Sequence, residues 1–280
     1  MPPVKIVITG PDGQTVRTLH GPARAGVNRI AWDLRLDPPT SLRTGRGESE
    51  NESATESGGE EGFRRGGGPT ALPGTYKVTL TANGHTESRN VEVGPDPRFP
   101  FDQQAAQAQL RAALEVRDQL SALNQALNRN GELRAQIKSM RTVLGGPERQ
   151  DGDRYAKLLD SAQQLDGKLS KWQEAVYNPA VQNDPKYYLH YLARLNDRMQ
   201  RLLSRINEDY DRAPSEEQTS EMAAVRSQVD EQVRSFNALL SDDVGKFNKM
   251  AADTGANTLY AGPAIALHGE RPQTQVSGGR

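Results

Sequence analysis

The chain of 280 residues contains no cysteine, so disulfide bonds, thiolate nucleophiles and cysteine metal ligands are excluded. It contains no run approaching the roughly 20 apolar residues that a helix needs to cross a bilayer. Its formal net charge is only −1, so it has no excess of positive charge to attract nucleic acid or an anionic lipid surface. The sequence therefore predicts a protein with no membrane span and no nucleic acid as partner.

Apolar residues are also scarce, since they make up 35% of the chain and the mean hydropathy is −0.76. Some segments therefore have too few apolar residues to join a core. The N-terminal sequence MPPVKIVITG has a single lysine and begins at once with strand-like alternation, which is not the pattern of a signal peptide. Because a strand begins so early, we expect the chain to be the end of a longer protein.

The first third of the chain shows the period-2 alternation that is typical of half-buried strands. Short alternating runs are separated by turns rich in glycine and proline, such as Pro11-Asp12-Gly13. The predicted strands cover residues 4–9, 15–19 and 27–35, and both sides of the Asn83-Gly84 turn. Five such strands predict an antiparallel Ig-like β-sandwich over residues 1–97, although this fold usually has about seven strands.

The predicted strand 27–35, VNRIAWDLR, places Ile30, Trp32 and Leu34 on one face. Trp32 is the largest apolar side chain of this region, so we expect it to anchor the core. Residues 38–71 then interrupt the alternation with a run rich in Gly, Ser and Glu, which predicts a disordered insertion between strands. Its acidic residues lack the spaced oxygen ligands of a calcium loop, so no cation site is assigned.

The stretch Gly94-Pro95-Asp96-Pro97 marks the change from strands to helices. Residues that precede proline are pushed out of the α region, so a regular helix does not continue through them. Beyond this stretch the apolar residues recur at helical spacing. We therefore place a domain joint at residue 97 and a helical domain over residues 98–253.

Four amphipathic helices are predicted in the helical domain. The first begins at the N-cap Asp102, the second covers residues 153–176, and the others are opened by Asp184-Pro185 and Pro214-Ser215. The second has the cleanest heptad seam of the chain. The seam residues are Tyr155, Leu158, Ala162, Leu165, Leu169, Trp172 and Val176. Long helices with short connections predict an up-and-down four-helix bundle.

The predicted fold class is therefore α+β multidomain, with an antiparallel Ig-like β-sandwich followed by an up-and-down four-helix bundle. Residues 254–280 are rich in Gly, Pro and Ala and are expected to form a tail that is mostly disordered. A few apolar residues of this tail could dock it on the bundle or on the sandwich. These residues are Leu259, Tyr260, Ile265 and Leu267.

The sequence assigns no residue to catalysis, to a cofactor or to a metal. The four histidines lie on different elements without the spacing of a helical metal pair. They are His20, His85, His190 and His268. No G-x-S-x-G elbow is present, and no pair of carboxylates stands out as a glycosidase pair.

A group of tyrosines is the one candidate for a sugar-stacking surface, but helical spacing explains most of these rings as part of a bundle core. The group consists of Tyr155, Tyr177, Tyr187, Tyr188 and Tyr191.

Several motifs occur in an informative order. VNRIAWDLR is followed by PGTYKVTLTANGHTESRNVEVGPDPR, then by LRAALEVRDQLSALNQALNRNGELRAQI and by SDDVGKFNKMAADTG. In this order they resemble the C-terminal part of bacterial exported proteins with sortilin-like BNR (Asp-box) β-propellers, which are often labelled glycosyl hydrolases. In those proteins a propeller is followed by an Ig-like module, similar to that of the flagellar hook-capping protein, and then by a helical region. The resemblance covers about residues 4–36 and 69–255, and the Asp-box repeats have no counterpart here.

The resemblance implies an exported protein, periplasmic or extracellular, whose partner is a propeller domain, another protein or a surface glycan. Because the propeller's catalytic or ligand residues have no counterpart, the label glycosyl hydrolase does not extend to this chain. We therefore expect a non-catalytic accessory or interaction region. The alternatives are a carbohydrate-binding module that uses Trp32 or the tyrosines, and part of a hydrolase whose catalytic propeller is missing here.

Overall fold

The computed structural model describes residues 4–43, 67–98, 100–146, 152–179, 193–208, 212–267 and 269. An antiparallel sheet is followed along the chain by helices, which confirms the α+β class. The chain divides into two compact units. The sheet unit comprises residues 1–118 and 199–222, and the helical unit comprises residues 119–198 and 223–280. The domain boundaries expected at residues 97 and 253 stay predictions.

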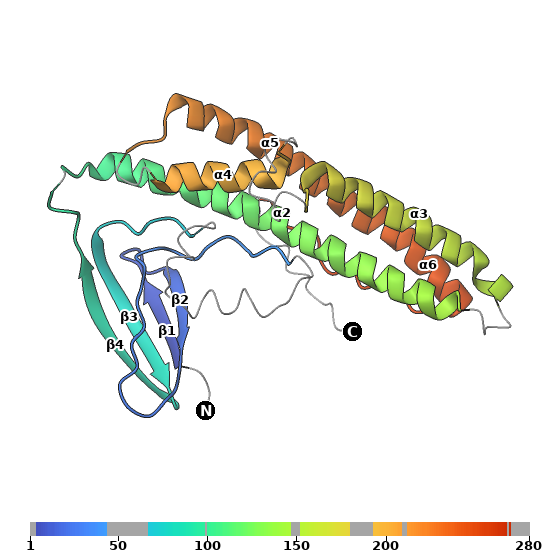
Figure 1. The fold of residues 1–280 in the computed structure, drawn as a ribbon, viewed down its shortest axis with the longest axis horizontal. Helices are drawn as coiled ribbons and strands as arrows, with labels where there is room; N and C mark the ends of the chain where they lie inside the picture. Colours follow the sequence, from blue (N-terminus) through green and yellow to red (C-terminus); the bar gives the residue numbers. More distant parts are fainter. Residues whose placement is uncertain are drawn as a thin grey trace, which may run out of the picture. The chain divides into compact units, whose positions relative to one another are not determined.

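The sheet has four antiparallel strands in the order β2-β1-β3-β4 (Figure 1). Its strands are β1 (Val4–Thr9), β2 (Thr15–Gly21), β3 (Gly74–Ala82) and β4 (His85–Val93). All four coincide with predicted strands. The last hairpin turns through Asn83 and Gly84, whose φ angles are 50° and 80°. Positive φ at both positions of a two-residue loop matches the strand twist, so the Asn-Gly pair sets this hairpin's register.

The strand predicted over residues 27–35 is wrong. This segment is irregular, apart from an isolated β-bridge at Arg35. Leu34 has a φ of 56°, which is outside the β region, and its side chain is 43% exposed. Trp32 Nε1 donates a hydrogen bond of 2.9 Å to the Arg35 carbonyl oxygen, which holds the turn. Ile30 and Trp32 still pack against the core, so their apolar character reflects packing without a strand.

The core of the sheet unit lies on one face of the sheet. Its buried residues come from three strands and two loop positions, and are Ile8, Leu19, Leu36, Ala71 and Tyr76. Leu110 and Leu114, near the start of α2 (Gln103–Leu144), pack against this cluster. A helix therefore occupies part of the face on which a sandwich would carry its second sheet. No second sheet is present within the described ranges.

The insertion expected over residues 38–71 is placed at both of its ends, whereas residues 44–66 lie outside the described part of the chain. Where the chain returns, the Leu36 N–H donates a hydrogen bond of 2.8 Å to the Pro69 carbonyl oxygen. Gly68 is packed so closely that a Cβ there would lie 1.8 Å from the Leu36 carbonyl oxygen. The base of the loop is therefore part of the folded sheet unit.

The remaining helical elements are α3 (Gly152–Val176), α4 (Leu195–Glu208), α5 (Glu216–Ala238), the π-helix η3 (Leu239–Val244) and α6 (Gly245–Thr254). The predicted N-cap Asp102 is confirmed, because its Oδ1 accepts hydrogen bonds of 2.8 and 3.1 Å from two backbone N–H groups of the first turn. Ser215 and Gln218 form the predicted capping box, with reciprocal bonds of 2.8 and 3.1 Å. The start predicted at Asp184-Pro185 lies outside the described residues.

Within the helical unit, α3 packs against both α2 and α5. The heptad seam predicted on α3 is buried along its whole length. Trp172 lies 4.6 Å from Phe236 between ring centroids, and its Nε1 donates a hydrogen bond of 3.0 Å to the Gln232 carbonyl oxygen. On the α2 side, Asn130 Nδ2 donates a hydrogen bond of 2.9 Å to the Leu169 carbonyl oxygen. The up-and-down four-helix arrangement stays a prediction.

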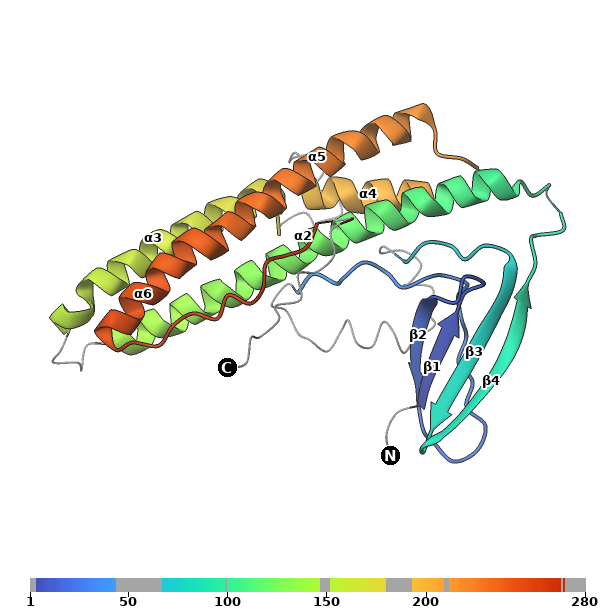
Figure 2. The same cartoon turned by 180° about the vertical axis from the view of Figure 1, so that it is seen from behind.

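The segment that follows α6 runs back along the helices of the same unit (Figure 2). Gly255 has a φ of 72°, and the N–H groups of Gly255 and Ala256 bond to carbonyls of the last turn of α6. This is a Schellman motif, which reverses the chain direction at a glycine. The side chains of Leu259, Ile265 and Leu267 are buried. The docking that the sequence left open therefore takes place on the helical unit.

Candidate functional site

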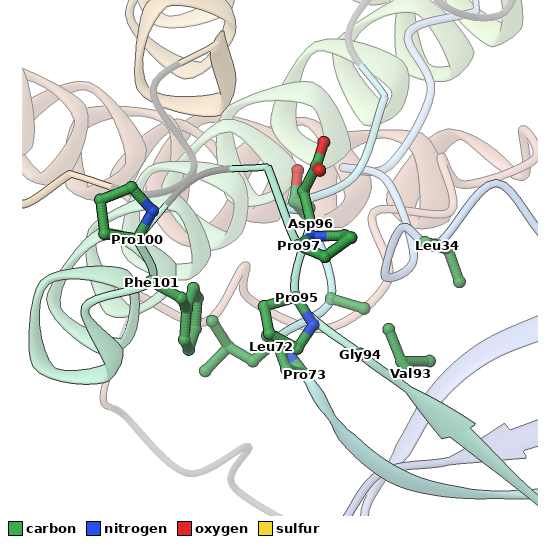
Figure 3. A pocket seen from close by; sticks show the side chains of 12 residues that line it. Leu34, Leu72, Pro73, Val93, Gly94, Pro95, Asp96, Pro97, Pro100 and Phe101 are labelled. Atoms are coloured by element: carbon green, nitrogen blue, oxygen red, sulfur yellow. The ribbon is translucent and has the colours of Figure 1, made fainter.

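A cavity of about 460 Å³ lies in the sheet unit, where β4 leads into α2. The lining residues are Leu34, Thr70, Ala71, Leu72, Pro73, Val93, Gly94, Pro95, Asp96, Pro97, Pro100 and Phe101. Figure 3 shows Leu72, Pro73 and Pro95 in the middle, with the Phe101 ring to their left. Leu34 and Val93 lie on the other side in this view. Three segments far apart in the sequence thus form one mainly apolar hollow.

The loop wall of the cavity is held by two hydrogen bonds. The Ala71 N–H donates a bond of 2.8 Å to the Leu34 carbonyl oxygen, and the Tyr76 hydroxyl donates one of 2.7 Å to the Leu72 carbonyl oxygen. Burial, together with the nearby charge of Asp12, raises the pKa of Tyr76 above its usual value. The hydroxyl therefore keeps the proton that it donates, and the core of the sheet fixes the position of the wall.

Prolines form a large part of the wall contributed by residues 93–101, where Pro95, Pro97 and Pro100 line the cavity. A proline ring fixes φ and carries no N–H, so this wall is stiff and poor in backbone donors. Its surface consists of apolar ring atoms, to which Phe101 adds an aromatic face. The cavity is therefore suited to an apolar side chain.

Asp96 is the one ionisable residue among those that line the cavity. Its carboxylate accepts hydrogen bonds from the Arg98 side chain, the shortest at 2.7 Å from Nη2 to Oδ2, and one of 3.0 Å from the Arg98 N–H. These bonds lower the pKa of Asp96 below its usual value. The carboxylate therefore stays ionised and paired at neutral pH, which is unsuited to a general acid.

The cavity adjoins the outer edge of β4, which no other strand pairs in the described part of the chain. The opposite edge of the sheet, at β2, is covered. There the Asp37 N–H donates a hydrogen bond of 2.8 Å to the Val16 carbonyl oxygen, and Asp37 Oδ1 accepts one of 3.3 Å from the Thr18 N–H. Among the residues that the structure describes, the β4 edge therefore presents a row of open backbone groups beside the cavity.

Those of the residues weighed from the sequence that the structure describes do not converge on a catalytic site. His20 and His85 are exposed on different strands, while His190 and His268 lie outside the described residues. Tyr155 and Tyr177 are buried, so neither contributes to a sugar-stacking surface. The other members of the tyrosine group, Tyr187, Tyr188 and Tyr191, are outside the described ranges.

The sequence did not predict the cavity. It identified Gly94-Pro95-Asp96-Pro97 as a joint, and the density of prolines there was the available signal. No sequence pattern indicated that Leu34 would line a cavity, because the positive φ of Leu34 follows from the packing of the loop base. A stretch in which prolines, a glycine and an aromatic residue cluster between elements is a reasonable place to look for such a hollow.

No family model, curated protein or solved structure matches this chain. The resemblance to the region that follows a BNR propeller therefore stays a prediction that rests on its own motifs. Three or more His, Asp or Glu residues gathered as metal ligands do not occur among the residues described. Of the helices described, none combines the length and apolarity needed to cross a membrane.

Proposed function

We propose that this chain is a non-catalytic interaction region that binds a partner protein where β4 leads into α2. The observation that carries the proposal is an apolar cavity whose one ionisable residue, Asp96, is held in an ion pair with Arg98. Such a lining offers shape and apolar surface, but no nucleophile with an adjacent base. The shape and the apolar surface of this cavity are what is needed to bind a side chain of another protein.

The partner that fits is an extended strand that adds to the open edge of β4 and inserts one apolar side chain into the cavity. Val93 belongs both to β4 and to the cavity wall, so the edge and the hollow are continuous. Glu87 and Arg89 pair with Leu80 and Val78 across the ladder and thus lie on their face of the sheet. Charges at these positions of an edge strand oppose pairing with a second copy, which favours a different protein as partner.

The Ig-like character of the sheet unit and the four-helix arrangement of the helices belong to this proposal. They are supported by the short antiparallel hairpins and by the buried seam of α3. The first partner to test is then a propeller domain, because a propeller precedes the Ig-like module in the proteins that this chain resembles. Sugar binding has less support, because Trp32 is half-buried against Tyr76.

The test measures the affinity of the chain for a separately produced propeller domain of the sortilin-like BNR type. Leu34→Asp puts a charge into the cavity wall at a residue that is 43% exposed, and should weaken binding by about tenfold or more. Val27→Asp is the matched control, because Val27 is fully exposed in the same loop and does not line the cavity. Equal affinity of the two variants would contradict the binding site. Turnover of a glycoside or peptide that a single Asp, Glu or His substitution abolishes would contradict the non-catalytic role.

A further inference from the structure

Side-chain amides of the helical unit bind the backbone of the segment after α6 in pairs of hydrogen bonds. The Leu259 N–H donates a bond of 2.7 Å to Asn248 Oδ1, and Asn248 Nδ2 donates one of 2.9 Å to the Leu259 carbonyl oxygen. The Tyr260 N–H donates 2.8 Å to Gln136 Oε1, and Gln136 Nε2 donates 3.3 Å to the Tyr260 carbonyl oxygen. Each amide therefore satisfies both backbone groups of one residue, as a neighbouring strand would.

A third pair follows further along the same segment. The Ile265 N–H donates a hydrogen bond of 2.9 Å to Asn237 Oδ1, and Asn237 Nδ2 donates one of 2.9 Å to the Ile265 carbonyl oxygen. The three amides come from α2, α5 and α6, which all contribute to the helical unit. Three elements thus present the same chemical group to one extended chain, and that chain has no helix or strand of its own.

Arg129 of α2 adds a contact between the second and third pairs. Its Nη1 donates a hydrogen bond to the Ala261 carbonyl oxygen, and its guanidinium carbon lies 5.9 Å from the centroid of the Tyr260 ring. A Cβ at Gly262 would lie 1.5 Å from Arg129 Nη1, and the φ of Gly262 is 67°. The positive φ therefore favours glycine at this position, whereas the Arg129 guanidinium lies at the end of a flexible side chain that can move aside.

The side chains of the segment divide into two groups. Leu259, Ile265 and Leu267 are buried, whereas Tyr260 is 71% exposed. The amides bind backbone groups, which are the same in every peptide, so they give no sequence preference. The preference for a particular sequence comes from the buried aliphatic side chains. This is the arrangement of a peptide-binding groove that has a peptide in it.

We propose that the groove formed by Gln136, Asn237 and Asn248 is a binding site for an extended peptide, and that residues 256–267 are its exchangeable ligand. The occupant to which the proposal commits is the same segment of a second copy of the chain, because that segment carries the fitting sequence. The covalent link holds the chain's own segment at an effective concentration of about millimolar. Exchange therefore becomes measurable when the attached segment is weakened. The groove lies in the helical unit and is independent of the cavity in the sheet unit.

The experiment uses a fluorescent peptide of residues 255–267, GANTLYAGPAIAL, and the full chain carrying Leu259→Ala and Ile265→Ala. These substitutions weaken the attached segment and leave every groove residue unchanged. Fluorescence anisotropy should show that the double variant binds the peptide at least about tenfold more tightly than the unaltered chain. Adding Asn237→Ala to the double variant should lower the affinity by about tenfold.

Two modified peptides separate backbone recognition from apolar contact. A peptide N-methylated at Ile265 loses the N–H that donates to Asn237 and should bind about tenfold more weakly. The matched control is N-methylated at Ala264, whose N–H makes no hydrogen bond to any described residue, and it should bind as the unmodified peptide does.

Two results would overturn the proposal. One is a double variant that keeps its helical circular dichroism but binds no peptide. The other is equal binding of the two methylated peptides. If the double variant does not fold, the single variant Ile265→Ala replaces it. The proposal is then overturned if the folded single variant binds no peptide or binds the two methylated peptides equally.

Discussion

Trp32 meets Tyr76 edge to face, with ring centroids 5.1 Å apart and ring planes at 65°. This contact joins an irregular segment to the central strand β3, because Tyr76 belongs to β3 and Trp32 to the loop that precedes it. Such pairs contribute beyond the apolar area that they bury. The aromatic pair therefore attaches the loop to the sheet, whereas the indole hydrogen bond to Arg35 holds the loop's own turn.

Replacing Trp32 with leucine should destabilise the sheet unit. The variant loses the aromatic pair and the hydrogen bond to the Arg35 carbonyl oxygen, which together predict a loss of about 2–3 kcal/mol. Urea unfolding followed by far-UV circular dichroism measures it, with Val27→Ala as the exposed control. Unchanged stability together with lost affinity for an oligosaccharide would show instead that Trp32 is a sugar-stacking residue.

Gly131→Ala and Gly167→Ala should each stabilise the protein by about 0.5–1 kcal/mol. Gly131 lies inside α2 and Gly167 inside α3, and a Cβ at either position meets no atom within 4 Å. Alanine restricts the unfolded chain and favours the helix at no steric cost. Thermal unfolding should show higher midpoints, and a lower midpoint for either variant would refute the packing seen at that position.

Gly68→Ala should have the opposite effect. A Cβ at this position would lie 1.8 Å from the Leu36 carbonyl oxygen, so the base of the loop must open to accept it. We expect a destabilisation of more than about 2 kcal/mol. The same thermal measurement tests it, and a neutral result would mean that the contact between residues 34–36 and 69–71 does not hold the loop in solution.

The stability of the helical unit should fall in the alkaline range because of Tyr177. Burial, and then the charge of Asp197, raises the pKa of Tyr177 from 10.0 to about 12. Between these values the unfolded chain has lost the phenolic proton and the folded chain keeps it, so the folded state binds more protons. The free energy of unfolding therefore decreases as the pH rises from 10 to 12. Below pH 10 the stabilising contribution of the raised Tyr177 pKa is fully present.

Tyr177→Phe tests this dependence, because phenylalanine has no proton to lose. Urea unfolding at several pH values between 9 and 12 should show a shallower decline for the variant than for the unaltered chain. A residual decline is expected from Tyr76, whose pKa is also raised. Parallel declines for the two proteins would contradict the burial of the Tyr177 hydroxyl.

Deleting Ser241 should be tolerated. From Val225 to Ala251 the buried seam advances 26 residues in seven steps, about 3.7 residues each, whereas an α-helix would drift by about 80° over that length. The π-helix η3 absorbs this drift. Removing one exposed residue from η3 leaves a regular α-helix whose seam is aligned to within about 20°. We expect a stability change within about 1 kcal/mol.

The matched control for this deletion is removal of Ser227, which is exposed in the regular part of α5. It rotates the preceding turns by about 100° and turns Val225 away from its buried position, at a cost of more than about 2 kcal/mol. Circular dichroism melts of the two deletions test the contrast. If the two deletions reduced the stability equally, η3 would not be the site of one extra residue within a continuous helix.

Local chemistry explains which parts of the fold the sequence predicted. Asn83-Gly84 sets a hairpin, and Asp102 and Ser215 begin helices through bonds within one turn. The signal in each case lies in neighbouring residues. The alternation around Trp32 is local as well, but it was misleading, because the loop base at residues 67–71 sets the backbone of that segment.

Contacts between distant segments explain what the sequence did not predict. The cavity combines Leu34 with Phe101, which only the folded chain brings together. The peptide groove is a clearer case, since Gln136 and Tyr260 are 124 residues apart and a glutamine on a helix surface is ordinary. Nothing in either local sequence indicates the pairing, because backbone recognition leaves no pattern in the residue that is recognised.

The amide pairs of Asn237 and Asn248 also predict how deamidation would affect the protein. Slow hydrolysis of an asparagine amide gives a carboxylate, which keeps an acceptor oxygen but can no longer donate to the carbonyl that faces it. Each such event would replace an attraction by a repulsion at one end of the segment, without cutting the chain. Stored protein should therefore release residues 256–267 in steps, at a rate set by deamidation, and mass spectrometry with limited proteolysis can follow each one.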